Sequence, residues 1–245
     1  MSEQNKARQM DSTLEVESIL IEPPQEKNER AFKIEQYLRR TYPNPVIALE
    51  FTTPLQLLVA VILSAQCTDV RVNIVTKELF RKYRTAKEFA NANRLELEQE
   101  IHSTGFYKSK AKNIISCCQT LIERYGGEVP QTMKELTALA GVGRKTANCV
   151  LGGCFNIPSG IVVDTHVRRL ANRLGLTDQD DPEKIEADLM KFIPKKDWIH
   201  FGNALIQHGR KVCVARKPLC AECVLKDLCP SAFTIVGRSG APTYK

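Results

Sequence analysis

Helix-start signals recur along this chain, whereas the alternating patterns that mark β-strands are nearly absent. Thr53-Pro54-Leu55-Gln56 places a capping threonine before a proline in the first helical position, and an apolar run follows. Thr85–Glu88 and Thr132–Glu135 repeat the capping pattern, and Asp181-Pro182 opens a helix that Pro194 ends. The sequence therefore predicts an all-α protein of roughly ten short helices.

The composition agrees with this prediction and gives limited information about partners. Apolar residues make up 43% of the chain and aromatic residues only 7%, a balance that suits a helical protein better than a sandwich or barrel of strands. The formal net charge of +7 at pH 7 fits phosphate binding but is common among proteins without a polyanionic partner.

No membrane span or export signal is predicted. The most apolar stretch, Leu57–Ala65, is roughly half the ~20 residues that a helix needs to cross a bilayer. The first twenty residues lack an apolar core behind basic residues, and their acidic side chains argue against a mitochondrial presequence. We therefore expect an intracellular protein, cytoplasmic or nucleoid-associated if bacterial, whose nine cysteines are thiols or metal ligands.

Four of these cysteines gather near the C-terminus in the pattern C-x6-C-x2-C-x5-C. Their segment has too little apolar content to pack unaided, so coordination of a zinc ion or an iron–sulfur cubane would have to fold it. Only one spacing is short, which favours the four corners of one [4Fe–4S] cluster. The predicted ligands are Cys213, Cys220, Cys223 and Cys229, and the core thiols are Cys67, Cys117, Cys118, Cys149 and Cys154.

A glycine-containing turn between two predicted helices indicates a helix-hairpin-helix motif. The first helix is expected to end near Leu139, Gly141-Val142-Gly143 forms the turn, and the second helix starts at Arg144. Glycines allow positive φ and close approach, and the turn amides together with the helix N-terminus suit a DNA phosphate. Lys145 follows in the first helical turn, where the helix dipole disfavours a cation and therefore favours the neutral amine of a nucleophile. A surface lysine that contacts phosphate is the alternative.

Asp164 lies where a short apolar stretch, Ile161–Val163, meets the start of another helix. Its simplest role is that of an N-cap carboxylate. Cleavage of a glycosidic bond also needs a carboxylate near the positive charge that develops on the sugar, and Asp164 can serve both purposes.

These motifs, in this order and spacing, resemble the endonuclease III family over about residues 31–230. The resemblance is carried by G-V-G-R-K-T-A-N at 141–148, V-D-T-H-V at 163–167 and the four-cysteine loop. It implies a base-excision repair DNA glycosylase with AP lyase activity that removes damaged, oxidised pyrimidines from duplex DNA. Lys145 would attack the sugar C1′ of a flipped-out nucleotide and form a Schiff base, β-elimination would follow, and Asp164 would stabilise charge on the sugar.

The family's fold implies two helical domains with the active-site cleft between them. One is a six-helix barrel that contains the hairpin, and the other is a [4Fe–4S] cluster domain built from both ends of the chain. The implied boundaries are 52–160 for the barrel, about 132–151 for its hairpin, 31–51 plus 161–232 for the cluster domain, and flexible tails at 1–30 and 233–245.

The resemblance also implies where damaged double-stranded DNA binds. Gln66 would fill the gap left by the flipped nucleotide, and Phe106 stands where the family usually has an aliphatic wedge. A helix-end amide and a buried aromatic are their respective alternatives. The full set of implied contacts is Gln66, Phe106, Gly141, Gly143, Arg144, His166, Arg216 and Lys217.

Three other functions are alternatives to this one. The related adenine glycosylases normally lack the hairpin lysine, so Lys145 argues against them. A glycosylase with another lesion preference, such as mismatched thymine or pyrimidine dimers, stays open. So does a non-catalytic DNA-binding iron–sulfur protein. We expect the protein to act as a monomer.

Overall fold

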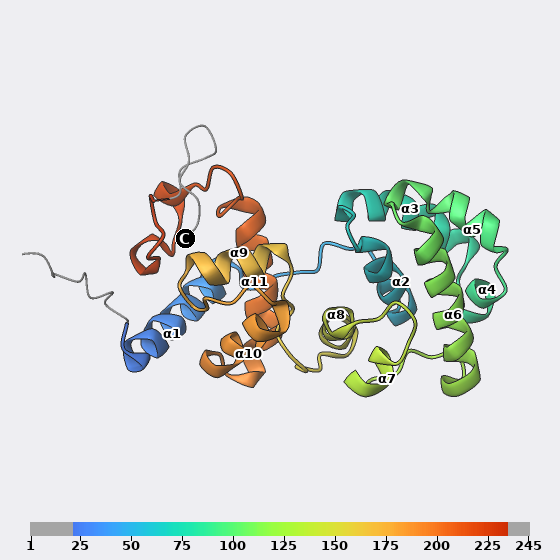
Figure 1. Cartoon of the computed structure of the whole chain (residues 1–245), viewed down its shortest axis with the longest axis horizontal. Helices are drawn as coiled ribbons and strands as arrows, with labels where there is room; N and C mark the ends of the chain where they lie inside the picture. The colour runs from blue at the N-terminus through green and yellow to red at the C-terminus, as the bar shows by residue number, and fades with distance from the viewer. Residues whose placement is uncertain (1–21, 235–245) are drawn as a thin grey trace, which may run out of the picture.

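The computed structural model describes residues 22–234, and every regular element within that range is helical, as the sequence predicts. Figure 1 shows the helices arranged as two lobes joined by extended segments. The α-helices are α1 (Pro24–Thr41), α2 (Pro54–Ser64), α3 (Asp69–Lys82), α4 (Ala86–Ala90), α5 (Arg94–Glu100), α6 (Tyr107–Tyr125), α7 (Met133–Thr137), α8 (Arg144–Phe155), α9 (Thr165–Arg173), α10 (Pro182–Phe192) and α11 (Trp198–Lys211). Short 3-10 turns are η2 (His102–Thr104), η3 (Lys195–Asp197), η4 (Cys220–Glu222) and η5 (Lys226–Leu228).

Each lobe has its own buried core. The barrel lobe consists of α2–α8, and its core runs from Leu49 to Leu151. The terminal lobe consists of α1, α9–α11 and the segment that follows them, and its core joins residues 31–42 to residues 161–225. The two helical domains expected from the sequence are therefore present, and one of them is built from both ends of the described chain (Figure 1).

Helix α2 is the central element of the barrel lobe. Every residue from Leu57 to Leu63 is buried, and the helix packs against α3, α6 and α8. A helix that is apolar on all sides is stable only when it is surrounded by protein. The predicted cap is confirmed, because Thr53 Oγ1 accepts the Gln56 backbone N–H at 3.2 Å. In a complete capping box the Gln56 side chain would accept the backbone N–H of Thr53. It accepts that of Thr52 instead, at 2.8 Å.

The prediction of a flexible N-terminal tail over residues 1–30 is wrong from Pro24 onward, because α1 begins there with proline in its first turn. Ala31, Ile34 and Leu38 bury the inner face of this helix in the terminal lobe. The first turns are polar, so the helical period of apolar residues becomes visible only from Ala31. Residues 1–21 of that predicted tail, and 235–245 of the C-terminal one, lie outside the described residues.

The predicted hairpin forms between α7 and α8. Helix α8 begins at Arg144 as expected, and α7 ends at Thr137, two residues before the expected position. Gly141 has a φ of +76°, and a Cβ at this position would come 2.9 Å from the Cβ of Asn113 on α6. Only glycine meets both demands. Gly143 caps α8 with a φ of −91°, so the positive φ foreseen for the turn glycines applies to Gly141 alone.

Candidate active site

A pocket between the two lobes contains both predicted catalytic residues. The barrel lobe lines it with residues of α2, α3 and α8, including Ser64, Asp69 and Lys145. The terminal lobe lines it with α11 and with the segment that carries Asp164. Folding therefore brings Lys145 and Asp164 to one concave site from different lobes.

Lys145 lies in the first turn of α8 and its side chain is exposed. Within residues 22–234 its ammonium takes part in no hydrogen bond or ion pair, so no protein contact holds it away from a ligand. The next turn of α8 carries Cys149, which also lines the pocket. Burial raises the pKa of the Cys149 thiol to about 12, so this thiol stays neutral beside the lysine.

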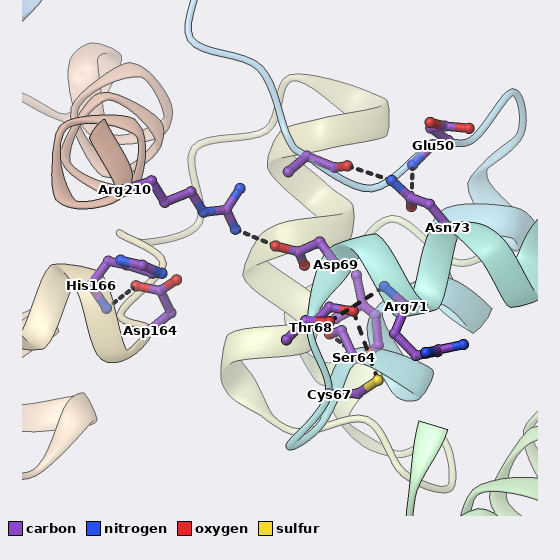
Figure 2. Close-up of polar contacts among 12 residues, drawn as sticks. Glu50, Ser64, Cys67, Thr68, Asp69, Arg71, Asn73, Asp164, His166 and Arg210 are labelled. Carbon is purple, nitrogen blue, oxygen red and sulfur yellow. Dashed lines mark hydrogen bonds and ion pairs between the residues drawn. The ribbon is translucent and has the colours of Figure 1, made fainter. Parts of the chain in front are cut away.

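Asp164 is the N-cap of α9, as predicted. Its Oδ1 accepts the backbone N–H groups of His166 and Val167 at 2.8 and 2.9 Å. Oδ2 accepts no hydrogen bond from any described residue. The cap thus fixes the orientation of the carboxylate while the side chain still lines the pocket (Figure 2).

Two further charged groups meet across the pocket, and sequence reasoning missed them. Arg210 on α11 donates to the carboxylate of Asp69, the first residue of α3 (Figure 2). Both side chains are about one-third exposed and both line the pocket, so the ion pair links the lobes there and is partly open to solvent. Asp69 carries a local signal only as a helix-start carboxylate, and no sequence pattern pairs it with Arg210.

Arg144, which the sequence analysis gives as a DNA contact, is hydrogen-bonded to another residue of the protein. Its Nε and Nη2 donate to Glu186 of α10 at 2.7 and 3.0 Å. Glu186 is buried and also accepts from Asn148 Nδ2 at 2.8 Å. The hydrogen bond that Arg144 donates to Glu186 is the main cause that raises the pKa of Arg144. Arg144 therefore links the barrel lobe to the terminal lobe directly beside Lys145.

Gln66 and Phe106 lie in exposed loops of the barrel lobe. Phe106 is 65% exposed, so the alternative of a buried aromatic is wrong. Gln66 lies two residues beyond the end of α2 rather than within it. Both residues have left-handed backbones, with φ of 53° and 48°, which is uncommon for residues other than glycine.

The four C-terminal cysteines line a second pocket, in the terminal lobe. Arg173 Nη1 lies 3.1 Å from the Sγ of Cys213, and the Leu225 N–H donates to the Sγ of Cys223 at 3.4 Å. N–H donors that point at sulfur would stabilise a cysteine thiolate once it is bound to iron. No three metal-binding side chains among residues 22–234 converge on a single-ion site. A cubane makes a different demand, because each of its four irons takes one thiolate.

His208 connects this second pocket to α1. Its Nδ1 lies 3.0 Å from the Tyr42 hydroxyl, and its Nε2 lies 3.3 Å from the Sγ of Cys223. Burial lowers the pKa of His208 to about 4, so the ring is neutral. Tyr42 then donates to Nδ1, and the Nε2–H donates to sulfur. The residues present fit a [4Fe–4S] cluster.

The remaining sequence predictions have mixed outcomes. Arg216 and Lys217 are exposed, on a loop that Arg173 anchors through the carbonyls of Val214 and Ala215 at 2.9 and 2.8 Å. No disulfide joins any of the nine cysteines, all of which lie within the described residues. Cys117 and Cys118 are buried in the barrel core as expected, while Cys67, Cys149 and Cys154 are only partly buried against it. No helix within residues 22–234 is long and apolar enough to cross a membrane.

Comparison with known proteins identifies the family. Residues 59–195 match the family described as HhH-GPD superfamily base excision DNA repair protein, and residues 213–229 match the iron-sulfur binding domain of endonuclease III. The second match begins and ends at the first and last of the four cysteines. A [4Fe–4S] cluster is therefore the cofactor of this chain.

Individual relatives agree over most of the chain. Endonuclease III of Synechocystis sp. is 54% identical over 215 residues, which cover 88% of this chain and 98% of the relative. A non-covalent endonuclease III–DNA complex has a TM-score of 0.81 at 43% identity and covers 84% of this chain and 97% of that one. A trapped endonuclease III–DNA covalent intermediate has the same score, identity and coverage. The chain belongs to the endonuclease III family of base-excision DNA repair proteins.

Proposed function

We propose that Lys145 is the nucleophile and Asp164 the charge-stabilising carboxylate of this enzyme, a bifunctional DNA glycosylase and AP lyase of base-excision repair. The observation that carries the proposal is the shared pocket, which receives an unpaired ammonium from the barrel lobe and an oriented carboxylate from the terminal lobe. A nucleophile and a group that stabilises developing charge must both reach one reacting sugar.

The substrate of this reaction is a damaged nucleotide that has left the stack of duplex DNA and entered the pocket. After the Lys145 ammonium loses a proton, which Oδ2 of Asp164 can relay to solvent, the Nζ lone pair forms a bond to C1′ while the bond from C1′ to the base breaks. The base leaves with that electron pair and takes up a proton. Loss of a proton from nitrogen and opening of the sugar give a Schiff base. Removal of a C2′ proton then breaks the C3′–O bond, and the strand is cut on the 3′ side of the lesion.

Asp164 acts on this sequence through its charge. As the base departs, positive charge develops on the sugar, and a fixed carboxylate stabilises it without reorganising. The two backbone N–H groups bound to Oδ1 supply that fixation. Oδ2 has no protein donor among the described residues, so it can take part in the proton transfers of Lys145.

DNA reaches the pocket along the hairpin and the loops of the barrel lobe. A Cβ at Gly143 would meet no protein atom within 4 Å, so the start of α8 is open to a phosphate that approaches its backbone amides. Gln66 enters the gap left by the extruded nucleotide and Phe106 wedges between neighbouring bases, and the exposure of both side chains supports these roles. Arg216 and Lys217 contact phosphate from the terminal lobe, and His166 lies beside Asp164.

The [4Fe–4S] cluster has a structural role in this proposal. Cys213, Cys220, Cys223 and Cys229 hold it, and the cluster fixes the loop that carries Arg216 and Lys217. All four corners are cysteine, so no iron is left open to substrate. The cluster domain spans 31–51 and 161–232, the barrel domain spans 52–160, and the enzyme works as a monomer in the compartment that contains the DNA.

Oxidised pyrimidines are the proposed lesions, and one assay tests the reaction and the lesion class together. The protein is incubated with duplex DNA that contains thymine glycol, mismatched thymine or no lesion, and borohydride is added to reduce any imine. We expect a covalent complex with the thymine glycol duplex and none with undamaged DNA. Lys145→Gln should form no complex while it still binds an abasic-site analogue. A normal complex with Lys145→Gln would assign the nucleophile to another amine. A preference for mismatched thymine would correct the lesion class.

A further inference from the structure

A buried lysine in the barrel lobe has no part in the chemistry described above. Lys110, in the first turns of α6, is 4% exposed. Its ammonium donates to the backbone carbonyl of Leu63 at 2.7 Å and to that of Thr104 at 2.8 Å. No carboxylate pairs with it among residues 22–234. Burial lowers the pKa of Lys110, against a smaller opposing effect of Cys67.

Burial of this ammonium lowers the stability of the fold unless the two carbonyls would otherwise lack a hydrogen-bond donor. A buried ammonium without an anion is destabilising, and an aliphatic side chain of similar length would fill the same space. Both acceptors are at ends of helical segments, because Leu63 is in the last turn of α2 and Thr104 ends η2. Carbonyls at such ends have no partner within their own helix and carry the negative end of its dipole. One ammonium satisfies both.

Each of the two carbonyls lies within three residues of a residue that is proposed to enter DNA. Gln66 follows Leu63 by three positions, and Phe106 follows Thr104 by two. Both have left-handed backbones, which persist only where the surrounding structure maintains them. The backbone N–H of Lys110 also donates to the Phe106 carbonyl at 3.0 Å. Lys110 is thus bonded to both loops at once.

We propose that Lys110 is a positioning residue that sets the distance between Gln66 and Phe106 and so determines how well the enzyme extrudes a nucleotide. The inference rests on the proposed entry of these two residues into the duplex. One of them must fill the vacated space while the other separates neighbouring bases, so their spacing has to match the stack. Without Lys110 each loop can move independently of the other.

The experiment compares two reactions that depend differently on extrusion. Removal of thymine glycol requires a stacked base to leave the helix, whereas an abasic site lacks a base that must be unstacked. Lys110→Met keeps the length and apolar stem of the side chain and removes the donors. We expect single-turnover base removal to fall by about 10- to 100-fold, as for a misplaced positioning group, and strand cleavage at a preformed abasic site to stay within about threefold.

A fluorescent adenine analogue next to the lesion should report less unstacking with Lys110→Met than with the unchanged enzyme. Lys112→Met is the matched control, because Lys112 is an exposed lysine of the same helix and its loss changes the charge equally. The double variant Lys110→Met/Phe106→Ala should remove the base no more slowly than the slower of the two single variants, because both changes impair the same extrusion step.

The outcomes separate this inference from the proposal beneath it. Equal losses of base removal and abasic-site cleavage in Lys110→Met, or full activity, would overturn the positioning role. No effect of Phe106→Ala and Gln66→Ala on base removal would instead overturn their entry into DNA. If Lys110→Met does not fold, Lys110→Gln, which keeps an N–H donor, decides by the same comparison. Failure of both variants to fold would make Lys110 a stability residue alone and overturn the proposal.

Discussion

Arg144 and Glu186 are joined by two hydrogen bonds, at 2.7 and 3.0 Å, that cross from the barrel lobe to the terminal lobe. Arg144 is the first residue of α8 and directly precedes Lys145. A Cβ at Gly160 would lie 1.8 Å from Glu186 Oε1, so the glycine leaves room for this carboxylate between the lobes. The ion pair therefore fixes the start of the helix that carries Lys145, the proposed nucleophile.

Glu186→Gln tests whether Arg144 serves the lobe interface or the DNA. The change keeps the shape of the side chain but removes the charge that faces Arg144, whose side chain is 38% exposed. We expect the free energy of unfolding to fall by about 1–3 kcal/mol, near the lower value because solvent screens the arginine. Thermal and denaturant unfolding measure it. If Arg144 mainly binds phosphate, its release should steepen the slope of log affinity against log salt by about one unit instead.

Asp164→Asn separates the charge of this residue from its capping role. Asparagine is an equally good N-cap, so its Oδ1 keeps the bonds from His166 and Val167 and unfolding should change little. Turnover on thymine glycol DNA should fall by about 100-fold or more, since the developing charge on the sugar loses its partner. Asp164→Ala is the control, and it should lose about 1 kcal/mol of stability as well. An Asn variant with normal turnover would leave Asp164 as a cap only.

The pKa of His166 predicts how stability depends on acid. Burial is the main cause that lowers this pKa, Asp164 opposes the shift, and Arg169 and Arg210 add to it. The unfolded chain then binds the proton first as the pH falls below about 6.5. Stability should be constant above that pH and decline as the pH drops toward the folded-state pKa. His166→Gln should show a smaller decline in melting temperature between pH 7 and 5.

The same shift keeps His166 neutral at pH 7, so it adds no positive charge at the DNA surface. The salt slope of DNA binding should therefore be unchanged in His166→Gln at that pH. A ring proton titration midpoint above 6.5 in the folded enzyme would contradict both expectations.

Cys220→Ser tests whether the cluster supports DNA binding. Loss of one thiolate should lower the iron content and destabilise the loop 214–219, which carries Arg216 and Lys217. Affinity for lesion and undamaged duplex should fall together, because phosphate contacts carry no sequence information. The salt slope should become shallower by about one unit for each lost phosphate contact. Cys117→Ser, in the barrel core, is the comparison and should keep its iron. A Cys220 variant with full iron and an unchanged slope would remove the loop from the DNA surface.

Features that depend on neighbours along the chain could be predicted from the sequence. The capping box at Thr85 forms in both directions with Glu88, and α8 begins at the residue that follows the glycine turn. Asp164 caps α9 through amides two and three residues away. Such bonds close within one turn, so residue type and spacing predict them. The start of α1 was missed because its first turns are polar and only packing on the terminal lobe stabilises them.

Contacts between side chains that are far apart in the sequence could not be predicted, because they depend on tertiary packing. Arg144 donates a hydrogen bond to Glu186, 42 residues away along the chain. Lys110 donates to the carbonyl of Leu63 at a separation of 47 residues, and Arg210 donates to Asp69 at a separation of 141. None of these pairs has a local signal, because each depends on how helices far apart in the sequence pack together: within the barrel lobe for Lys110 and Leu63, and across the two lobes for the other two pairs. Residue type and spacing could therefore single out Lys145 and Asp164 as candidates, whereas packing brings them to one pocket and places Arg144 against Glu186.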